Sequence, residues 1–313
     1  MKDFRIVTYF ASWKMDGMKK VRYDCLSQIN YAFAIPTEDG EIRPLEHPEV
    51  AERLIREGHE HGVQVLISVG GWSYLDIPLE DTFIKATETP EKTEKLADAI
   101  AAMVEEYGFD GADMDWEHPR VKKGSHKQNE YLLELLAQKL HAKGKLLTAA
   151  VLGGRDAAGN DDLEDQNGCS ISDAAMGHTD RALELLDFVH IMSYDGGDGS
   201  LHSSFEFAMA CGDYWKNTRG VPAEKLILGV PFYGRPGGAC YADMFSFDPQ
   251  ADQHDTCEVN GVTAHYNGIP TMRKKTRYAK ENLGGIMIWE IAEDAYNPDK
   301  SLLKAIADEA AKD

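Results

Sequence analysis

Eight short runs of apolar and β-branched residues recur along the 313-residue chain, and helical patterns separate several of them. Strands that alternate with helices are typical of a parallel sheet, and eight such units favour a closed (β/α)8 TIM barrel over an open sheet. No linker rich in proline or serine divides the sequence, so we expect a single domain over 1–313. The runs are RIVTYF (5–10), INYAFA (29–34), VQVLISVGG (63–71), FDGADMDWE (109–117), KLLTAAVLGG (145–154), FVHIMSYD (188–195), KLILGVPFYGR (225–235) and GGIMIWE (284–290).

Three intervening or closing segments have the marks of helices. Thr89 precedes Pro90 as a typical N-cap and Gly108 is a typical helix end, which predicts a helix over 89–108. Leucines repeat at i, i+4 from position 132 to 140, which predicts a second helix over 128–144. The final segment, SLLKAIADEAAKD (301–313), is interpreted as a last helix.

The fourth run crowds acids into an apolar stretch. Side chains alternate faces along a strand, so Asp113, Asp115 and Glu117 share one face while Met114 and Trp116 share the other. Neighbouring acids then start roughly 6–7 Å apart along the backbone. In a partly dry barrel they cannot all ionise at low cost, so at least one proton is expected to be shared or retained near neutral pH.

The spacing of these acids leaves more than one chemistry open. Groups whose pKa values are pushed apart can act as an acid and a base, with Glu117 nearest the barrel mouth as the candidate proton donor. The same oxygen ligands could hold Mg²⁺ or Ca²⁺. They could also be ordinary surface acids on a loop mistaken for a strand, although the interleaved apolar residues disfavour this.

The net charge of the sequence limits which classes of binding partner are expected. Lys and Arg number 33 and Asp and Glu number 53, so the formal charge is 33 − 53 = −20, which repels nucleic acid and anionic membranes. A neutral or cationic substrate and a monomeric protein are expected.

The opening MKDFRIVTYF lacks the apolar run of a signal peptide, so we expect either a cytoplasmic protein or one whose leader has been removed. The cysteines are scattered, although Cys240 and Cys257 share one long loop and could pair in a secreted protein.

Five motifs, in order along the chain, resemble those of glycoside hydrolase family 18, the chitinases and their relatives. DGADMDWE (110–117) is similar to the DxxDxDxE signature of that family. The others are VLISVGGW (65–72) on the third strand, IMSYD (191–195) on the sixth, LGVPFYGR (228–235) on the seventh and GGIMIWE (284–290) on the eighth. The resemblance implies substrate-assisted hydrolysis of β-1,4 bonds beside N-acetylglucosamine with retention, and no cofactor or metal ion.

The resemblance also implies roles for individual residues. Glu117 protonates the leaving oxygen and then deprotonates water, Asp115 holds the acetamido N–H of the substrate, and Asp113 tunes Asp115. Tyr194 presses the acetamido oxygen toward C1, and Trp289 forms the floor of that subsite. Further contacts with the sugar or with the acids are expected from Trp72, Asp195, Met192, Tyr9, Ser68, Phe33, Tyr233 and Arg235.

Two departures from the family pattern are expected to matter differently. His118 stands where many relatives have Tyr, and strand parity predicts that it faces away from the barrel with little effect. Only residues 236–270 separate Arg235 from a helix expected near Thr271, and the stretch GGACYADMFSFDPQADQHDTC (237–257) within them is interpreted as an irregular loop. A full α+β insertion domain is therefore not expected, and the groove should be open and favour endo cleavage. An endo-β-N-acetylglucosaminidase acting on N-glycan cores, or a non-catalytic chitinase-like lectin, are the alternatives.

Overall fold

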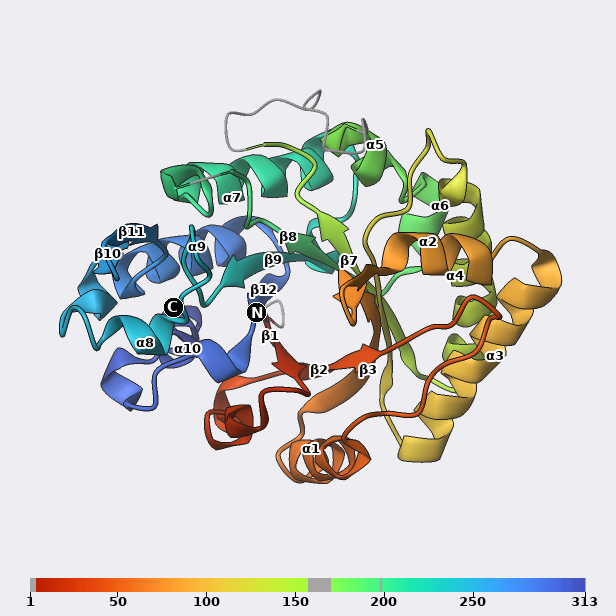
Figure 1. The fold of residues 1–313 in the computed structure, drawn as a ribbon, viewed down its shortest axis with the longest axis horizontal. Helices are drawn as coiled ribbons and strands as arrows, with labels where there is room; N and C mark the ends of the chain where they lie inside the picture. Colours follow the sequence, from red (N-terminus) through yellow and green to blue (C-terminus); the bar gives the residue numbers. More distant parts are fainter. Residues whose placement is uncertain (1–3, 157–169, 198, 313) are drawn as a thin grey trace. The chain divides into compact units, whose positions relative to one another are not determined.

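The computed structural model describes residues 4–156, 170–197 and 199–312 (Figure 1). Eight strands close a barrel in the order β1-β12-β9-β8-β7-β6-β3-β2, so the predicted (β/α)8 fold is confirmed. In chain order these strands are β1 (Arg5–Ala11), β2 (Gln28–Ala34), β3 (Gln64–Gly71), β6 (Gly111–Trp116), β7 (Leu146–Leu152), β8 (Phe188–Met192), β9 (Leu226–Pro231) and β12 (Gly285–Trp289). By contacts, the chain divides into two compact units, one of Met1–Ser27, Gly153–Asp161 and Ile191–Asp313, the other of Gln28–Leu152 and Asp162–His190.

In the second unit, β2, β3, β6 and β7 pair side by side in parallel. The predicted helix over 89–108 is confirmed, because the Thr89 side chain accepts a hydrogen bond from Lys92 N and Gly108 ends the helix at φ 79°. The second predicted helix begins earlier than expected, at Ser125. The helices of this unit are α1 (Pro48–Glu60), α2 (Leu79–Ala86), α3 (Pro90–Tyr107), α4 (Ser125–His141), α5 (Ile171–Met176) and α6 (Asp180–Leu185), and β4 (Ser73–Tyr74) pairs with β5 (Ile77–Pro78).

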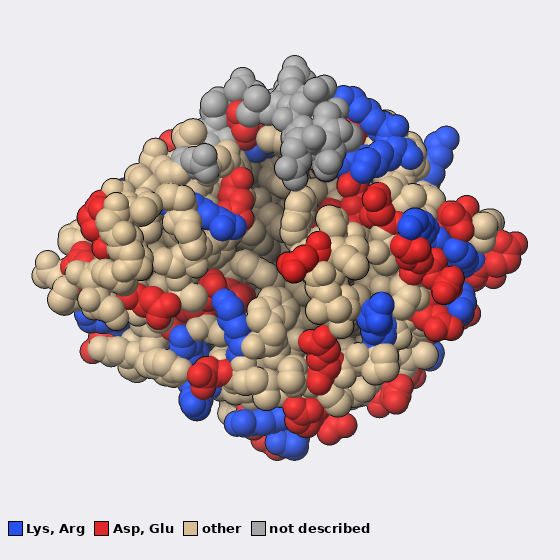
Figure 2. All heavy atoms as spheres, viewed as in Figure 1, with Lys and Arg blue, Asp and Glu red and all other residues tan. Residues whose placement is uncertain are grey.

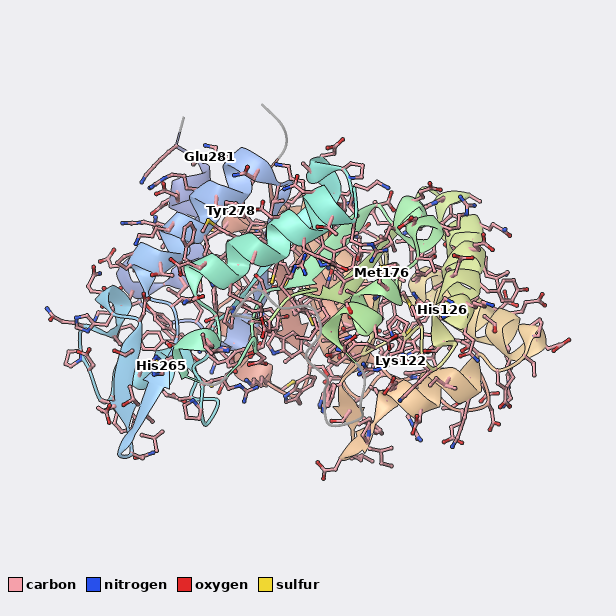
Figure 3. All side chains as sticks on the ribbon, turned by 90° about the horizontal axis from the view of Figure 1, so that it is seen from above. Lys122, His126, Met176, His265, Tyr278 and Glu281 are labelled. Atoms are coloured by element: carbon pink, nitrogen blue, oxygen red, sulfur yellow. The ribbon has the colours of Figure 1, made fainter. Side chains whose placement is uncertain are left out.

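In the first unit, β12 pairs in parallel with β1 on one side and with β9 on the other. The helices are α7 (Phe205–Asp213), α8 (Tyr241–Met244), α9 (Ile269–Asn282) and α10 (Leu302–Ala310). Tyr278 of α9, labelled in Figure 3, donates its hydroxyl hydrogen to the Met209 carbonyl of α7 at 3.2 Å and so ties these two helices together. The predicted last helix is α10, which begins at Leu302 after the N-cap Ser301.

The segment between β9 and α9 is more ordered than expected. Residues 237–257, which were expected to form an irregular loop, contain the short helix α8. The segment then continues into an antiparallel hairpin of β10 (Thr256–Val259) and β11 (Val262–His265), which was not expected. Backbone hydrogen bonds in both directions between Arg235 and His265, at 2.9 and 2.7 Å, fasten the hairpin to the end of β9. Figure 3 labels His265 at this hairpin. The segment is nevertheless too small to form a full α+β insertion domain.

The two loop cysteines do not pair. Cys240 and Cys257 are both free thiols. Cys240 Sγ lies 3.7 Å from Oε1 of Glu293, whereas Cys257 Sγ lies 3.8 Å from the Met244 carbonyl oxygen. Each thiol is thus directed to a different neighbour, and burial raises the pKa of Cys240 to about 11. Of the other three cysteines, Cys25 and Cys211 are also free thiols, and Cys169 lies outside the described residues.

The surface shown in Figure 2 carries charged side chains of both signs. Figure 2 shows basic and acidic side chains interspersed on the face it presents. Within the described ranges, no helix is both long and apolar enough to cross a bilayer.

A buried carboxylate, Asp294, connects the loop after β12 to α10. Its oxygens accept hydrogen bonds from the Ser301 hydroxyl at 2.6 Å and from the backbone N–H of Leu302 at 2.8 Å and of Leu303 at 3.2 Å. Burial raises the pKa of Asp294, while these hydrogen bonds oppose the increase. The start of α10 therefore depends on a carboxylate that reaches it from outside the helix.

Asp294→Ala should lower the free energy of unfolding by about 2–4 kcal/mol, because several buried donors lose their acceptor. Urea denaturation monitored by circular dichroism would measure it. Asp299→Ala, an exposed aspartate in the same loop, is the matched control and should change stability by no more than about 0.5 kcal/mol. Equal stability of the two variants would contradict the anchoring role of Asp294.

Candidate active site

The lowest acid of the β6 row, Asp113, is held by both neighbouring strands. The register places Ser68 of β3 and Thr148 of β7 level with it. The Ser68 hydroxyl donates to Oδ2 of Asp113 at 2.8 Å, and the Thr148 hydroxyl donates to Oδ1 at 2.6 Å. Nδ1 of His190 lies 3.1 Å from the same Oδ1. These contacts compensate a carboxylate with no exposed surface.

Two of these partners were not among the residues predicted for the site. They are Thr148 and His190. A signal for both was available in the sequence: Thr148 lies on the strand that follows the acidic strand, and His190 alternates with Met192 and Tyr194. What could not be predicted was the level at which each strand pairs with its neighbour, and that level decides which side chains reach Asp113.

The middle acid, Asp115, is buried beside two like charges. It is 4% exposed. Burial raises its pKa well above 3.8, and the neighbouring charges of Glu117 and Asp113 raise it further. Among the described residues, Oδ1 of Asp115 has no hydrogen-bond partner although it is buried. A buried polar atom in this state is suited to a donor that arrives with a ligand.

The top acid, Glu117, lies just beyond the strand. β6 ends at Trp116, so the expected strand over 109–117 is shorter at both ends, and Glu117 begins the following loop. Its side chain keeps 17% exposure. His118 was expected to face away from the barrel with little effect, but its Nε2 lies 3.7 Å from Oε2 of Glu117, so it contacts one of the acids. Parity fails here because alternation ends with the strand.

The opposite face of β6 packs as predicted. Trp116 is buried and stacks on Phe83 of α2, with ring centroids 4.8 Å apart and an interplanar angle of 11°. Met114 is also buried. The apolar residues therefore fix the strand against a helix, and this fixes the direction of the acids between them.

The glycine pair at the end of β3 allows the chain to come close to the acids. A Cβ on Gly70, whose φ is 117°, would lie 2.3 Å from the Asp115 carbonyl oxygen. A Cβ on Gly71 would lie 2.7 Å from the Phe33 ring. Phe33 thus covers Gly71, and the next residue, Trp72, is 52% exposed. An exposed indole directly after a strand of this barrel is available to a ligand.

Asp195 is the centre of a second polar cluster, in the other unit. Its carboxylate accepts hydrogen bonds from the Tyr233 hydroxyl at 2.8 Å and from Nε and Nη2 of Arg235 at 2.9 and 3.2 Å. Its backbone N–H donates to Nδ1 of the buried His202 at 3.2 Å. Burial tends to raise the pKa of Asp195, but His202, Arg235 and Tyr233 together hold it well below its usual range. This carboxylate therefore stays ionised.

The predicted aromatic residues of this unit are partly assembled. Tyr9 packs edge-on against Trp289, with ring centroids 5.4 Å apart, and Tyr194 packs edge-on against Tyr233 at 6.4 Å. Tyr9 was predicted beside Asp113, and its ring contact is with Trp289. Met192 is buried at the end of β8, whereas Tyr194 and Trp289 are half-buried. Tyr194 and Trp289 therefore each offer part of an aromatic surface.

Metal binding was the main alternative for the acidic row. Within residues 4–156, 170–197 and 199–312, no three or more His, Cys, Asp and Glu side chains are grouped so that they could hold a metal ion. The row is instead organised by hydrogen-bond donors at its base and by repulsion above. Such an arrangement can store one proton and place a second acid where solvent and ligands reach it.

Asp115→Asn should change stability in a pH-dependent way. The unfolded carboxyl has a pKa of about 3.9, and the folded one is higher, so wild type loses stability as pH rises between the two values. The amide variant carries no such cost. Its advantage over wild type should be close to zero near pH 4 and should grow as the pH rises toward 8.

Thermal and urea unfolding at both pH values would measure this difference. Asp39→Asn, at an exposed position of the same unit, is the control and should show no pH-dependent advantage. An advantage of Asp115→Asn that is constant or shrinks with rising pH would contradict the raised pKa.

Comparison with known proteins identifies relatives along most of the chain. The family model described as glycosyl hydrolases family 18 matches residues 5–294. Chitinase A1 of Niallia circulans is 27% identical over 310 residues, covering 78% of this chain and 42% of that protein. A chitinase-like effector of Moniliophthora roreri is 28% identical over 255 residues, covering 72% of this chain and 57% of that protein. The chain thus spans about half the length of these two curated relatives.

Solved structures give the same fold. A family 18 chitinase from the chitin utilization locus of Flavobacterium johnsoniae is 27% identical with a TM-score of 0.80, covering 99% of this chain and 94% of that one. A chitinase from Bacteroides thetaiotaomicron, 23% identical with a TM-score of 0.79, covers 98% and 97% and supports the fold alone. Since the family model spans nearly all of the sequence, the chain belongs to glycosyl hydrolases family 18.

Proposed function

We propose that this protein is a chitinase that hydrolyses β-1,4 bonds between N-acetylglucosamine units with retention and with assistance from the substrate. The observation that carries the proposal is the row on β6: a buried Asp115 with a raised pKa and an unpartnered oxygen, directly below an accessible Glu117. A carboxyl that tends to keep its proton is a poor nucleophile. This supports attack on C1 by the acetamido oxygen of the substrate.

In the first step, Glu117 gives its proton to the glycosidic oxygen as the C1–O bond breaks. The acetamido oxygen forms a bond to C1, and the sugar becomes an oxazolinium ion. Asp115 accepts the acetamido N–H through its unpartnered oxygen and shares its own proton with Asp113, so that negative charge faces the cation. In the second step, water attacks C1, its proton returns to Glu117, and the bond from C1 to the acetamido oxygen breaks.

The residues of the other unit bind and orient the sugar. Tyr194 donates to the acetamido oxygen, and the indole of Trp289 supports the apolar face of the ring. Asp195 stays charged within its cluster with Tyr233 and Arg235 and accepts hydrogen bonds from sugar hydroxyls. Met192, Tyr9 and Phe33 shape the walls, and Trp72 stacks on the leaving-group side.

We propose endo cleavage because the segment after β9 forms a short helix and a hairpin instead of a folded insertion domain. A low wall lets a long chain enter sideways, so that cutting begins at internal bonds. It also provides fewer stacked aromatics to hold the product between cuts, each contributing about 0.5–1.5 kcal/mol beyond area burial.

Glu117→Gln should keep the fold and substrate binding but lower kcat on chitohexaose by about 10²–10⁴-fold, because the transferable proton is gone. Mass spectrometry of early products from chitohexaose and from a high-mannose glycopeptide, offered in parallel, would measure this. Wild type should give mixed oligomer lengths and leave the glycopeptide intact. Glu49→Gln, an exposed glutamate on α1, is the control and should behave as wild type.

Each other outcome has a definite meaning. Turnover by Glu117→Gln within a few-fold of wild type would contradict the role of Glu117. Glycopeptide cleavage with intact chitohexaose would identify an endo-β-N-acetylglucosaminidase. Binding of either sugar by wild type without cleavage would identify a lectin, and nearly pure disaccharide would contradict endo cleavage.

A further inference from the structure

A cavity of about 310 Å³ lies in the first unit, and none of the acids of the row lines it. One wall comes from the segment that follows β9, and the other from the loop that follows β12. Both walls therefore extend from the carboxyl ends of barrel strands, the end where ligands of this fold bind. The lining residues are Ala242, Phe245, Pro249, Ala295, Tyr296, Asn297 and Lys300.

Tyr296 is an exposed aromatic that the structure holds in place. Tyr296 is 55% exposed, although it is a large aromatic residue. Nη2 of Arg22 donates to the Tyr296 carbonyl oxygen at 3.0 Å, and Nζ of Lys20 lies 4.6 Å from the centroid of its ring. One face of the ring is thus occupied by a cation, while the residue still lines the cavity. A ring fixed in this way loses little freedom when a ligand stacks on it.

The charge at the cavity is already balanced. Nζ of Lys300 lies 4.5 Å from the centroid of the Phe245 ring and 3.7 Å from Oδ1 of Asp252, and it donates to the Pro249 carbonyl. An anionic ligand would have to compete with these partners, so a neutral one is favoured. Asn297 and Lys300 still place N–H donors next to an otherwise apolar and aromatic lining.

We propose that this cavity binds one N-acetylglucosamine ring of a chitin chain, as a second sugar site outside the catalytic one. A pyranose has an apolar C–H face that suits an aromatic wall, and polar groups at its edge that suit the amide and ammonium donors. The volume is at the lower end for ligand pockets, which fits one ring better than a protein segment. The identity of the sugar rests on the proposed chitinase function.

A second sugar site would matter most on the insoluble polymer. The polymer offers many sugar units, so binding of one unit in the cavity would hold the protein on the polymer and raise the effective concentration of cleavable bonds. A short oligomer that only fills the catalytic site would not use the cavity. The two kinds of substrate should therefore respond differently to changes at Tyr296.

The test uses Tyr296→Ala, Tyr296→Leu and Tyr296→Phe, with Phe247→Ala as the matched control. Phe247 is a similarly exposed aromatic, at 45%, in the segment after β9, and it is absent from the cavity lining. In a Glu117→Gln background, adsorption to insoluble chitin should weaken about 3- to 10-fold for Tyr296→Ala and Tyr296→Leu. Tyr296→Phe keeps the ring and should adsorb as wild type, as should Phe247→Ala.

In the active protein, kcat/KM on chitotriose should stay within about 2-fold of wild type for every Tyr296 variant. Adsorption by Tyr296→Leu equal to wild type would overturn the proposed sugar site, even if chitotriose is cleaved normally. If wild type cleaves neither chitotriose nor chitohexaose but Tyr296→Leu still loses adsorption, the chitinase function fails and the sugar site stands. Leu replaces the ring with another large apolar side chain, so Tyr296→Leu removes the aromatic surface with less risk to the fold. Thermal unfolding of each variant would show whether its fold is intact.

Discussion

The constraint on which the proposed active site depends is electrostatic repulsion among three acids, of which Asp113 and Asp115 lie on β6 and Glu117 lies just beyond its end. Asp113 is compensated by hydroxyl donors from both neighbouring strands. Glu117 is relieved by its position beyond the strand end, where solvent reaches it. Asp115 has neither advantage, so the cost of crowding falls on it and raises its pKa. Gly70 allows β3 to lie close to β6 at this point, because a Cβ there would lie 2.3 Å from the Asp115 carbonyl oxygen.

The contrast with Asp195 shows how environment decides the state of a carboxyl group. Asp195 receives a bidentate Arg235 and the Tyr233 hydroxyl, and its pKa is held low. Asp115 is buried among like charges, and its pKa is raised. Asp195 is therefore suited to keep a fixed negative charge that orients polar groups. The other is suited to hold a proton until positive charge develops beside it.

Features that depend on local sequence could be predicted from it. Alternation along β6 separates the acids from Trp116 in the structure as in the sequence, and Thr89 and Gly108 begin and end α3 as expected. Features that depend on long-range register could not. The contact of Thr148 with Asp113 follows from how β6 pairs with β7. Cys240 and Cys257 have different neighbours and remain unpaired because of where α8 and the β10–β11 hairpin pack. His118 escaped prediction because no pattern marks Trp116 as the last strand residue.

If Asp115 keeps its proton rather than attacking the sugar, the nucleophile must be the acetamido oxygen of the substrate. Partly deacetylated chitosan tests this claim most directly, because it offers acetylated and deacetylated units at every bond. The new reducing ends, analysed by mass spectrometry, should be N-acetylglucosamine at essentially every cut. New reducing ends that are glucosamine in good yield, or a sugar trapped covalently on Asp115 or Glu117, would contradict substrate assistance.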